Sequence, residues 1–257
     1  MPDNFGQYAD TVQGGTVTFL KSERSVQRWG VRQRPLARTI LQFGVDGGPG
    51  ITHGITDPAY TTLLMQVTDF DDRVFLDGVP CPSRVLIVLP PDSHFTVTRT
   101  GPLEWFSWSI PTSEAIALKM VPAPLVPTPL KTEKVMVGLG AAEASRLRRT
   151  ARHVLDIARP SSTDNGGQED ILFDELESAW EKRDSTTSLP CEETHSAEQI
   201  VFRALKFVQS RPDQAIEINA LAKAGGVGYR TLLRAFERYL KIPPKHYLKL
   251  RQINNVY

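Results

Sequence analysis

Short runs rich in apolar and β-branched residues mark the first 121 residues of the chain. They lie at residues 16–20, 39–43, 62–67, 85–89, 95–98 and 105–110, and turn residues such as Asp77-Gly78 and Gly101-Pro102 separate them. Short runs of this kind between turn residues are typical of strands. Several short strands at such spacing predict an antiparallel sandwich or barrel.

A helical period replaces these runs further along the chain. Residues 121–129 contain four prolines, which predict a stiff connector, and residues 160–195 carry 10 acidic and 2 basic residues, which indicate a solvated linker. Either the apolar stripes between these points pack on the β domain, or they form a dimerising helix pair. The stripes are Leu147, Ala151, Val154, Leu155 and Ala158, and Leu172, Leu176, Ala179 and Trp180.

The last sixty residues predict a short helix, a tight turn and a second helix. Three glycines, Gly225, Gly226 and Gly228, relieve the backbone at the turn. From residue 196 onward, 11 Lys and Arg stand against 4 Asp and Glu, a net charge of +7, whereas the whole chain is +1. A basic helical unit favours phosphate binding. Its apolar positions are Ile218, Leu221, Ala222, Val227, Leu232, Leu233 and Phe236.

Composition limits the function classes. A chain of 257 residues with 40% hydrophobic and 23% charged residues is expected to form two domains with buried cores. Cys81 and Cys191 lie far apart, which indicates a reducing environment without a disulfide framework. The sequence has no signal-peptide pattern and no apolar run long enough to span a membrane, so we expect a cytoplasmic protein. The five histidines show no metal-ligand spacing, and we expect that the protein is not an enzyme.

The C-terminal residues resemble the first helix-turn-helix of the AraC/XylS-type transcription regulators. That motif has the pattern LA, a glycine-bearing turn, R-t-L-x-R-x-F, P-x-x-Y and a linker helix that opens with Arg. Two residues depart from this pattern. Gly228 stands where the family usually has a helix-capping Ser. Lys241 stands where the family usually has a Gly in the left-handed conformation, which would cost a Lys about 1 kcal/mol. The matching residues are Leu221, Ala222, Val227, Arg230, Thr231, Leu232, Arg234, Phe236, Pro244, Tyr247 and Arg251.

The resemblance implies an α+β multidomain protein. Its expected parts are a cupin-like jelly-roll effector domain (1–121), a connector with a helical dimerisation segment and acidic linker (122–195), and the helix-turn-helix (196–257). The family joins two such motifs through a linker helix, so we interpret the chain end, inside that helix, as a truncation. The resemblance implies that the protein is a transcription activator. Its implied partners are promoter DNA, a small-molecule effector, a second copy of the chain and RNA polymerase.

The recognition helix is expected to run from about Gly228 to Leu240 and to enter the major groove. Tyr229, Arg230 and Thr231 are the predicted contacts to base edges, and Arg234 and Arg238 are further exposed polar residues of this helix. The predicted phosphate contacts, which fix register without reading sequence, are Lys223, Lys245 and Lys249.

An arginine-rich stretch in the first domain is a second candidate site. Residues 21–38 contain six Lys and Arg against a single Glu. If the chain is extended there, as Pro35 favours, Arg32, Arg34 and Arg38 share one face. Guanidinium forks bind phosphate and guanine in bidentate fashion, and an aromatic ring can stack on a base. The predicted effector-binding residues are Arg28, Trp29, Arg32, Arg34 and Arg38.

Within this stretch, RPLAR fits the R-x-x-x-R pattern by which PilZ domains hold cyclic di-GMP, although their D/N-x-S-x-x-G partner motif is absent. The chain is thus similar to the cyclic-di-GMP-responsive AraC-like activators of extracellular polysaccharide genes, which makes cyclic di-GMP the predicted effector. Four alternatives stay open: a solvated or contact-forming arginine face, a sugar or other metabolite inside the jelly roll, a metal-dependent cupin enzyme, and an interaction module without a ligand.

Overall fold

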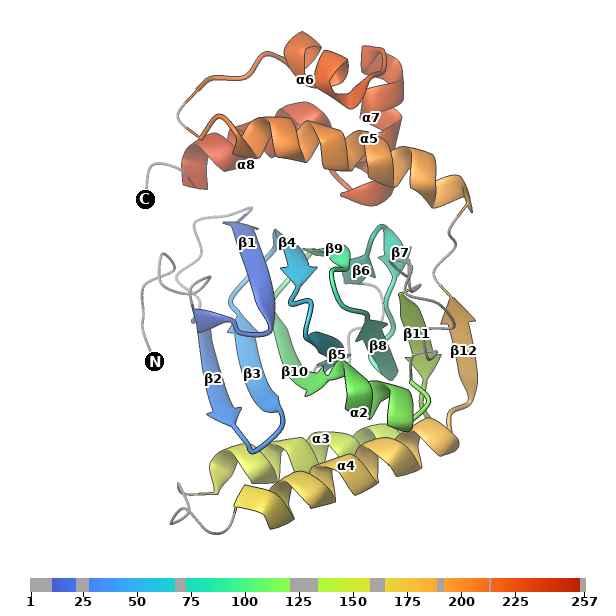
Figure 1. The fold of residues 1–257 in the computed structure, drawn as a ribbon. Helices are drawn as coiled ribbons and strands as arrows, with labels where there is room; N and C mark the ends of the chain where they lie inside the picture. The colour runs from blue at the N-terminus through green and yellow to red at the C-terminus, as the bar shows by residue number, and fades with distance from the viewer. Residues whose placement is uncertain are drawn as a thin grey trace.

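Two antiparallel β-sheets form the middle of the molecule, with a helical unit at one end and a helix pair at the other (Figure 1). This computed structural model describes residues 11–21, 28–67, 73–120, 134–157, 165–188, 192–212 and 214–254. The predicted connector at residues 121–129 lies outside the described residues. The predicted α+β class with antiparallel sheets is confirmed.

One sheet is five-stranded and the other seven-stranded. The five-stranded order is β1 (Gly15–Lys21), β4 (Gly50–Thr56), β9 (His94–Arg99), β6 (Val74–Leu76) and β7 (Val79–Pro80). The seven-stranded order is β12 (Ser185–Ser188), β11 (Val135–Gly138), β8 (Val85–Leu89), β5 (Tyr60–Gln66), β10 (Leu103–Pro111), β3 (Ile40–Asp46) and β2 (Gly30–Pro35). All six predicted strands occur, as β1, β3, β5, β8, β9 and β10.

The pleat gives the five-stranded sheet two different faces. On β1, Phe19 lines the cavity between the two sheets, whereas Thr18 faces the helical unit. Register places Thr18 opposite His53 on β4, and His53 opposite Thr96 on β9. Since side chains alternate along each strand, these three form one row across the outer face of the sheet.

Helices α3 (Ala141–Asp156) and α4 (Asn165–Glu181) cover the seven-stranded sheet. Their apolar stripes are buried in one core cluster with the strand residues Leu41, Phe106 and Trp108. Leu147 and Leu176 have no exposed surface at all. The packing interpretation is therefore confirmed, and the alternative that these stripes form a dimer interface is wrong because the sheet already covers them. Ala158 lies outside the described residues.

The predicted boundary at residue 121 does not separate the β domain from the next part of the chain. Strands β11 and β12 extend the seven-stranded sheet from within the segment predicted to be a connector and linker. One of the acidic residues there, Glu175, also pairs with Arg146 of α3 at 3.0 Å. Backbone pairing with β8 thus makes residues 134–157 and 165–188 part of the β domain, and the separate middle segment is a wrong prediction.

The C-terminal helical unit consists of α5 (Glu192–Gln209), α6 (Ile218–Gly225), α7 (Tyr229–Tyr239) and α8 (Pro244–Asn254). Gly226 ends α6 in the left-handed conformation, with φ +74°, and Gly228 is the N-cap residue of α7. Leu221, Leu232 and Phe236 are fully buried in the core of the unit, together with residues of α5. The predicted helix, turn and helix are thus all present.

Two residues near the C-terminus give different outcomes. Lys241 follows α7 with φ +58°, which is the left-handed conformation expected for it, and its Nζ lies 5.1 Å from the Phe75 ring centroid. Arg251, in contrast, does not open the last helix, because α8 begins at Pro244. Arg251 is buried and donates to the carbonyl oxygens of Pro212 (2.7 Å) and Gln214 (3.3 Å), so it holds the loop between α5 and α6.

The helical unit packs on the outer face of the five-stranded sheet. The Tyr239 hydroxyl donates to Asp77 Oδ1 at 2.6 Å, and the Thr98 hydroxyl donates to the Leu240 carbonyl at 3.2 Å. Asn254 of α8 exchanges two hydrogen bonds with the backbone of Lys21, each of 3.1 Å. These contacts join the two parts at three separate places.

The Asp77-Gly78 turn between β6 and β7 lies directly against the end of α7. Both residues have positive φ, +51° and +81°, as a two-residue type I′ hairpin requires. A Cβ atom built on Gly78 would lie 2.2 Å from the Arg238 carbonyl oxygen. Only glycine therefore allows the turn and the helix to approach this closely.

We predict that Gly78→Ala lowers the free energy of unfolding by about 2 kcal/mol, because alanine is strained at this φ and clashes with the α7 backbone. Urea denaturation followed by circular dichroism measures the change. Gly101→Ala is the matched control, since its Cβ would meet nothing closer than the flexible Arg73 side chain at 3.5 Å. Equal destabilisation by the two variants would contradict the packing argument.

Candidate functional site

One face of α7 is exposed and basic, and the other is buried. Arg230, Arg234 and Arg238 recur every four residues and are all exposed, as are Tyr229 and Thr231. Residues spaced by four lie on the same side of a helix, so the three arginines form a stripe. The opposite side packs into the core of the unit through Leu232, Ala235 and Phe236.

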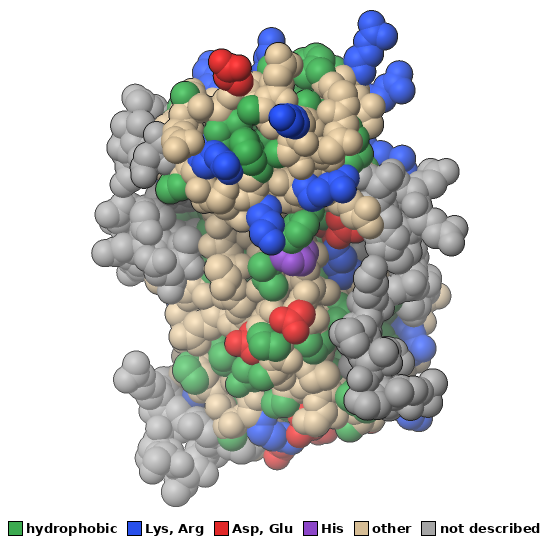
Figure 2. All heavy atoms as spheres, turned by 45° about the horizontal axis from the view of Figure 1, so that its top comes forward, with side chains coloured by type: hydrophobic (Ala, Val, Ile, Leu, Met, Phe, Trp, Pro, Cys, Tyr) green, Lys and Arg blue, Asp and Glu red, His purple; other side chains and the backbone are tan. Residues whose placement is uncertain are grey.

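The helices on either side of α7 add further positive charge. Lys223 on α6 and Lys245 and Lys249 on α8 are all exposed. Figure 2 shows Lys and Arg side chains predominating over acidic ones at the helical end of the molecule. An exposed basic surface of this kind can bind the phosphates of a nucleic acid.

Sequence reasoning missed Arg203. This exposed residue of α5 places its guanidinium beside the turn between α6 and α7, 3.7 Å from a Cβ built on Gly226. It belongs to no motif in the C-terminal stretch. The only sequence signal that includes Arg203 is the excess of basic residues from residue 196 onward. A net charge does not identify which basic residue lies near the turn.

The arginines predicted to bind an effector have partners within the chain. Arg34 Nη1 donates to the carbonyl oxygens of Val154 (2.7 Å) and Ile157 (2.6 Å) at the end of α3. Arg32 pairs with Asp156 at 3.0 Å. These two arginines do share one face of β2, as the alternation predicts, but that face lies against α3.

Arg38 lies beyond β2, in the turn to β3, and contacts three carboxylates. Its guanidinium is 2.9 Å from Asp170, 3.4 Å from Glu169 and 3.4 Å from Glu114. Burial alone would lower its pKa, but these carboxylates raise it on balance. Its charge is thus compensated by α4 and by α2 (Thr112–Ala117).

The other two predicted effector residues do not join this group. Trp29 is buried with Phe19 and Val31 on the opposite face of β2, where the Arg99 guanidinium lies 5.1 Å from its ring centroid. Arg28 is exposed ahead of the strand. Acidic residues of the same chain therefore compensate the charges of Arg32 and Arg38.

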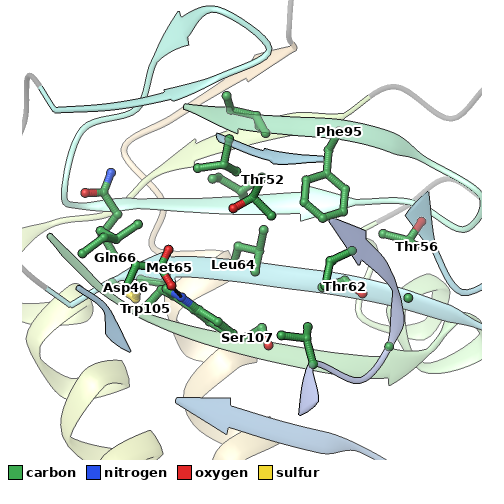
Figure 3. Close-up of a pocket in the computed structure, with 18 of the residues that line it drawn as sticks. Asp46, Thr52, Thr56, Thr62, Leu64, Met65, Gln66, Phe95, Trp105 and Ser107 are labelled. Carbon is green, nitrogen blue, oxygen red and sulfur yellow. Dashed lines mark hydrogen bonds between the residues drawn. The ribbon is translucent and has the colours of Figure 1, made fainter. Parts of the chain in front are cut away.

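A small cavity lies between the two sheets (Figure 3). It has a volume of about 90 Å³, and apolar side chains such as Leu64, Met65 and Phe95 form much of its wall. Trp105 Nε1 donates to Asp46 Oδ1 at 3.1 Å, and Gln66 Nε2 donates to the Cys81 carbonyl at 2.5 Å. Ligand pockets usually measure about 300–1,000 Å³, so this cavity is small for a ligand pocket.

His53 lies where the sheet meets the helical unit. It is buried, its Nδ1 lies 3.0 Å from Thr96 Oγ1, and its ring centroid is 5.9 Å from that of Tyr247 on α8. Burial lowers its pKa to about 4. The imidazole is therefore neutral at pH 7.

Two further features bear on function class. Among the described side chains, no group of three or more His, Cys, Asp and Glu residues could hold a metal ion. None of the helices within the described ranges is long and apolar enough to cross a membrane.

Cys81 is buried, and burial raises its pKa to about 11, which makes it a poor nucleophile. Cys191 lies outside the described residues.

No protein-family model matches the chain, and no curated protein matches it either. Among solved structures, it is similar to the AraC-like transcriptional activator CuxR, with 8% identity over 95% of this chain and 87% of that one, and a TM-score of 0.46. A similarity also extends to ToxT from Vibrio cholerae O395 bound to (E)-4-(8-methylnaphthalen-1-yl)but-3-enoic acid. The identity is 12% over 93% of this chain and 100% of that one, with a TM-score of 0.29.

A cupin 2 conserved barrel domain protein from Salinispora arenicola CNS-205 is similar over 39% of this chain and 89% of that one, with 14% identity and a TM-score of 0.28. All three TM-scores lie below 0.5. Likenesses this weak do not establish the family.

We predict that Arg34→Ala lowers the free energy of unfolding by about 2 kcal/mol, because two charge-assisted hydrogen bonds at the end of α3 are lost. Urea denaturation measures the change. Arg28→Ala, which removes the same charge from an exposed position, is expected to stay within about 0.5 kcal/mol of the parent. An Arg34→Ala protein as stable as the parent would contradict a structural role for this arginine.

We predict that His53 makes stability depend on pH. Because its folded pKa of about 4 lies below the ordinary 6.5, the unfolded chain binds more protons, so stability is full above pH 6.5 and is lost as pH falls towards 4. The parent should lose about 3 kcal/mol more than His53→Phe over this range. Urea denaturation at several pH values tests this, and His153→Phe, at an exposed position on α3, should behave like the parent.

Proposed function

We propose that the protein is a DNA-binding transcription regulator of the AraC type. The observation that carries the proposal is the stripe of Arg230, Arg234 and Arg238 on the exposed face of α7, next to a glycine turn that follows α6. Two helices joined in this way form a helix-turn-helix, in which the second helix enters the major groove. On this proposal, α7 is the recognition helix.

The residues of this surface then divide by role. Tyr229, Arg230 and Thr231 lie in the first turn of α7 and would contact base edges, as the N-terminal residues of a recognition helix do. Lys223, Lys245 and Lys249 would hold phosphates, and Arg203 beside the turn would join them. Arg234 and Arg238 lie farther along α7 and would follow the DNA backbone.

The β domain would receive the signal. From β3 onward its strands follow the orders β3-β10-β5-β8 and β4-β9-β6-β7 in the two sheets. This alternation between sheets supports the predicted jelly-roll, cupin-like domain. The proposal includes a cytoplasmic homodimer that activates transcription with RNA polymerase. The dimer contact would lie outside the buried stripes of α3 and α4.

Cyclic di-GMP remains the effector predicted from the R-x-x-x-R pattern, but the contacts of Arg34 and Arg38 weigh against that site. Binding there would have to displace Asp170, Glu169 and Glu114 from Arg38. Calorimetry of the intact protein with cyclic di-GMP decides this. Micromolar binding that Arg38→Ala abolishes would restore the site, whereas absence of binding would remove it.

We predict that Arg230→Ala reduces the preference for specific over non-specific DNA about tenfold, since a base contact is lost. Lys245→Ala should weaken binding to specific and non-specific DNA alike. It should also lower the slope of log affinity against log salt concentration by about one, because one phosphate contact is lost. Fluorescence anisotropy at several salt concentrations, with a duplex selected by the protein from a random pool, measures both effects.

Arg149→Ala is the matched control for this experiment, because it removes one exposed positive charge from α3, at the opposite end of the molecule. It should bind both DNAs like the parent. Equal loss of discrimination in Arg230→Ala and Lys245→Ala would contradict the division of roles. Failure of the parent to bind any duplex at low salt would contradict the proposed function.

A further inference from the structure

The C-terminal end of α7 is held on the β domain through four consecutive residues. Two of the pairs are hydrogen bonds of 2.6 Å and 3.2 Å, one is a close backbone approach, and one places an ammonium group over an aromatic ring. The partners in the β domain lie on β6, on β9 and in the turn between β6 and β7. These pairs, which we call the α7 contact, are Arg238 with Gly78, Tyr239 with Asp77, Leu240 with Thr98 and Lys241 with Phe75.

Strand alternation turns Phe75 towards the helical unit. Its neighbours Val74 and Leu76 line the cavity between the two sheets, so the pleat directs Phe75 to the outer face. Register places Phe75 opposite Thr98 on β9. One row of the outer face therefore supplies two members of the α7 contact.

Lys241 continues the basic stripe of α7 beyond the end of the helix. It follows Arg238 by three residues, and burial together with the nearby charge of Arg238 lowers its pKa. Lys241 is exposed, but its ammonium lies 5.1 Å from the Phe75 ring centroid, where a cation–π attraction holds it. The docked arrangement thus directs the last cation of the stripe onto the β domain.

DNA bound along the stripe would come close to the α7 contact. The N-terminal residues of a recognition helix contact the bases, so its C-terminal part lies at the rim of the groove, beside a phosphate backbone. With 11 residues, α7 is about 16 Å long, whereas the major groove is about 12 Å wide. The turn between β6 and β7 touches α7 at Arg238 and therefore lies near the path of that backbone.

The interface around the α7 contact is not closely packed throughout. A cavity of about 270 Å³ lies between α5 and the strands β1, β4 and β9. Two side chains of the β domain, Leu20 and Ile51, join the apolar core of the helical unit. Folded domains move relative to one another unless their interface is large and hydrophobic. We therefore expect the helical unit to leave the sheet without unfolding.

We infer that the α7 contact is autoinhibitory. In the docked form the β6–β7 turn covers the C-terminal end of the reading helix and Phe75 holds Lys241, whereas in the open form Lys241 reaches a DNA phosphate. The inference rests on the proposed function, because it concerns access of DNA to α7. If DNA binds the open form, the docked form lowers the apparent affinity in proportion to the fraction of open molecules.

Tyr239→Phe opens the contact from the side of the helical unit. It removes the hydroxyl that donates to Asp77 and keeps the ring in the apolar core. Losing a hydrogen bond to a buried carboxylate should shift the docking equilibrium about tenfold towards the open form. Fluorescence anisotropy with the selected duplex should then show binding about five- to tenfold tighter than that of the parent. Tyr60→Phe, on β5 of the other sheet, is the matched control and should bind like the parent.

Hydrogen exchange at single amides, measured by NMR, shows whether the interface has opened. The Lys21 N–H donates to Asn254 Oδ1 across the interface at 3.1 Å, whereas the Leu232 N–H donates to the Gly228 carbonyl within the helical unit at 3.0 Å. In Tyr239→Phe the Lys21 amide should exchange faster and the Leu232 amide should not. This pattern distinguishes an open interface from an unfolded helical unit.

Thr98→Val opens the contact from the other side. It removes the donor to the Leu240 carbonyl with little change of shape and alters no residue of the helical unit. DNA binding should therefore tighten in this variant too. Faster Lys21 exchange with unchanged or weaker DNA binding in both variants would overturn the inference. Parent-like Lys21 exchange in both would overturn it as well, because the contact would then not hold the unit on the sheet.

Lys241→Ala tests whether the contact withholds a cation from DNA. In the parent it should change DNA affinity by no more than about twofold, since it removes one contact from the docked form and one from the DNA-bound form. In the Tyr239→Phe background, where the docked form is less populated, it should weaken binding several-fold. Equal effects in the two backgrounds would overturn the role assigned to Lys241.

The inference and the proposed function fail in different ways. If neither the parent nor Tyr239→Phe binds any duplex at low salt, the proposed function is wrong and the inference fails with it. If both bind the duplex equally while Lys21 exchange shows that the interface has opened, only the autoinhibition is wrong.

Discussion

The carboxylate of Asp77 is the group on which the arrangement of this molecule depends. It is buried at the tip of the β6–β7 hairpin, where it accepts hydrogen bonds from the Tyr239 hydroxyl and the Thr96 backbone N–H and pairs with Lys134. Burial raises its pKa, because desolvation disfavours the charged form. A buried carboxylate is tolerated only when such partners surround it, so the sheet and the helical unit must stay together to satisfy it.

This docking produces the surfaces that matter for function. The apolar side of α7 packs into the core of the helical unit, and only its C-terminal end meets the hairpin, so its arginine stripe faces outward. The sheet and α5 do not close completely beside the contact, and a cavity of about 270 Å³ remains between them. The proposed reading face and this cavity lie on different sides of the helical unit.

The arginine-rich stretch shows how a charge pattern changes meaning in three dimensions. Six basic residues close together in sequence indicate an anion site when they are considered alone. In the fold, α3 and α4 bring Asp156, Glu169 and Asp170 against them, and Arg34 caps the end of α3. The same residues then stabilise the packing of two helices on a sheet.

Local patterns in the sequence determined most of the elements. Short apolar-rich runs between turn residues placed six strands, helical spacing placed α3, α4, α6 and α7, and the three glycines placed the turn after α6. Each of these signals acts over a few residues. Tertiary structure alone decided the rest. Strands β11 and β12 joined the sheet through backbone pairing that leaves no local pattern, the arginines found carboxylates more than a hundred residues away, and His53 came to line a cavity under α5. These outcomes depend on contacts between distant segments, which no short stretch of sequence encodes.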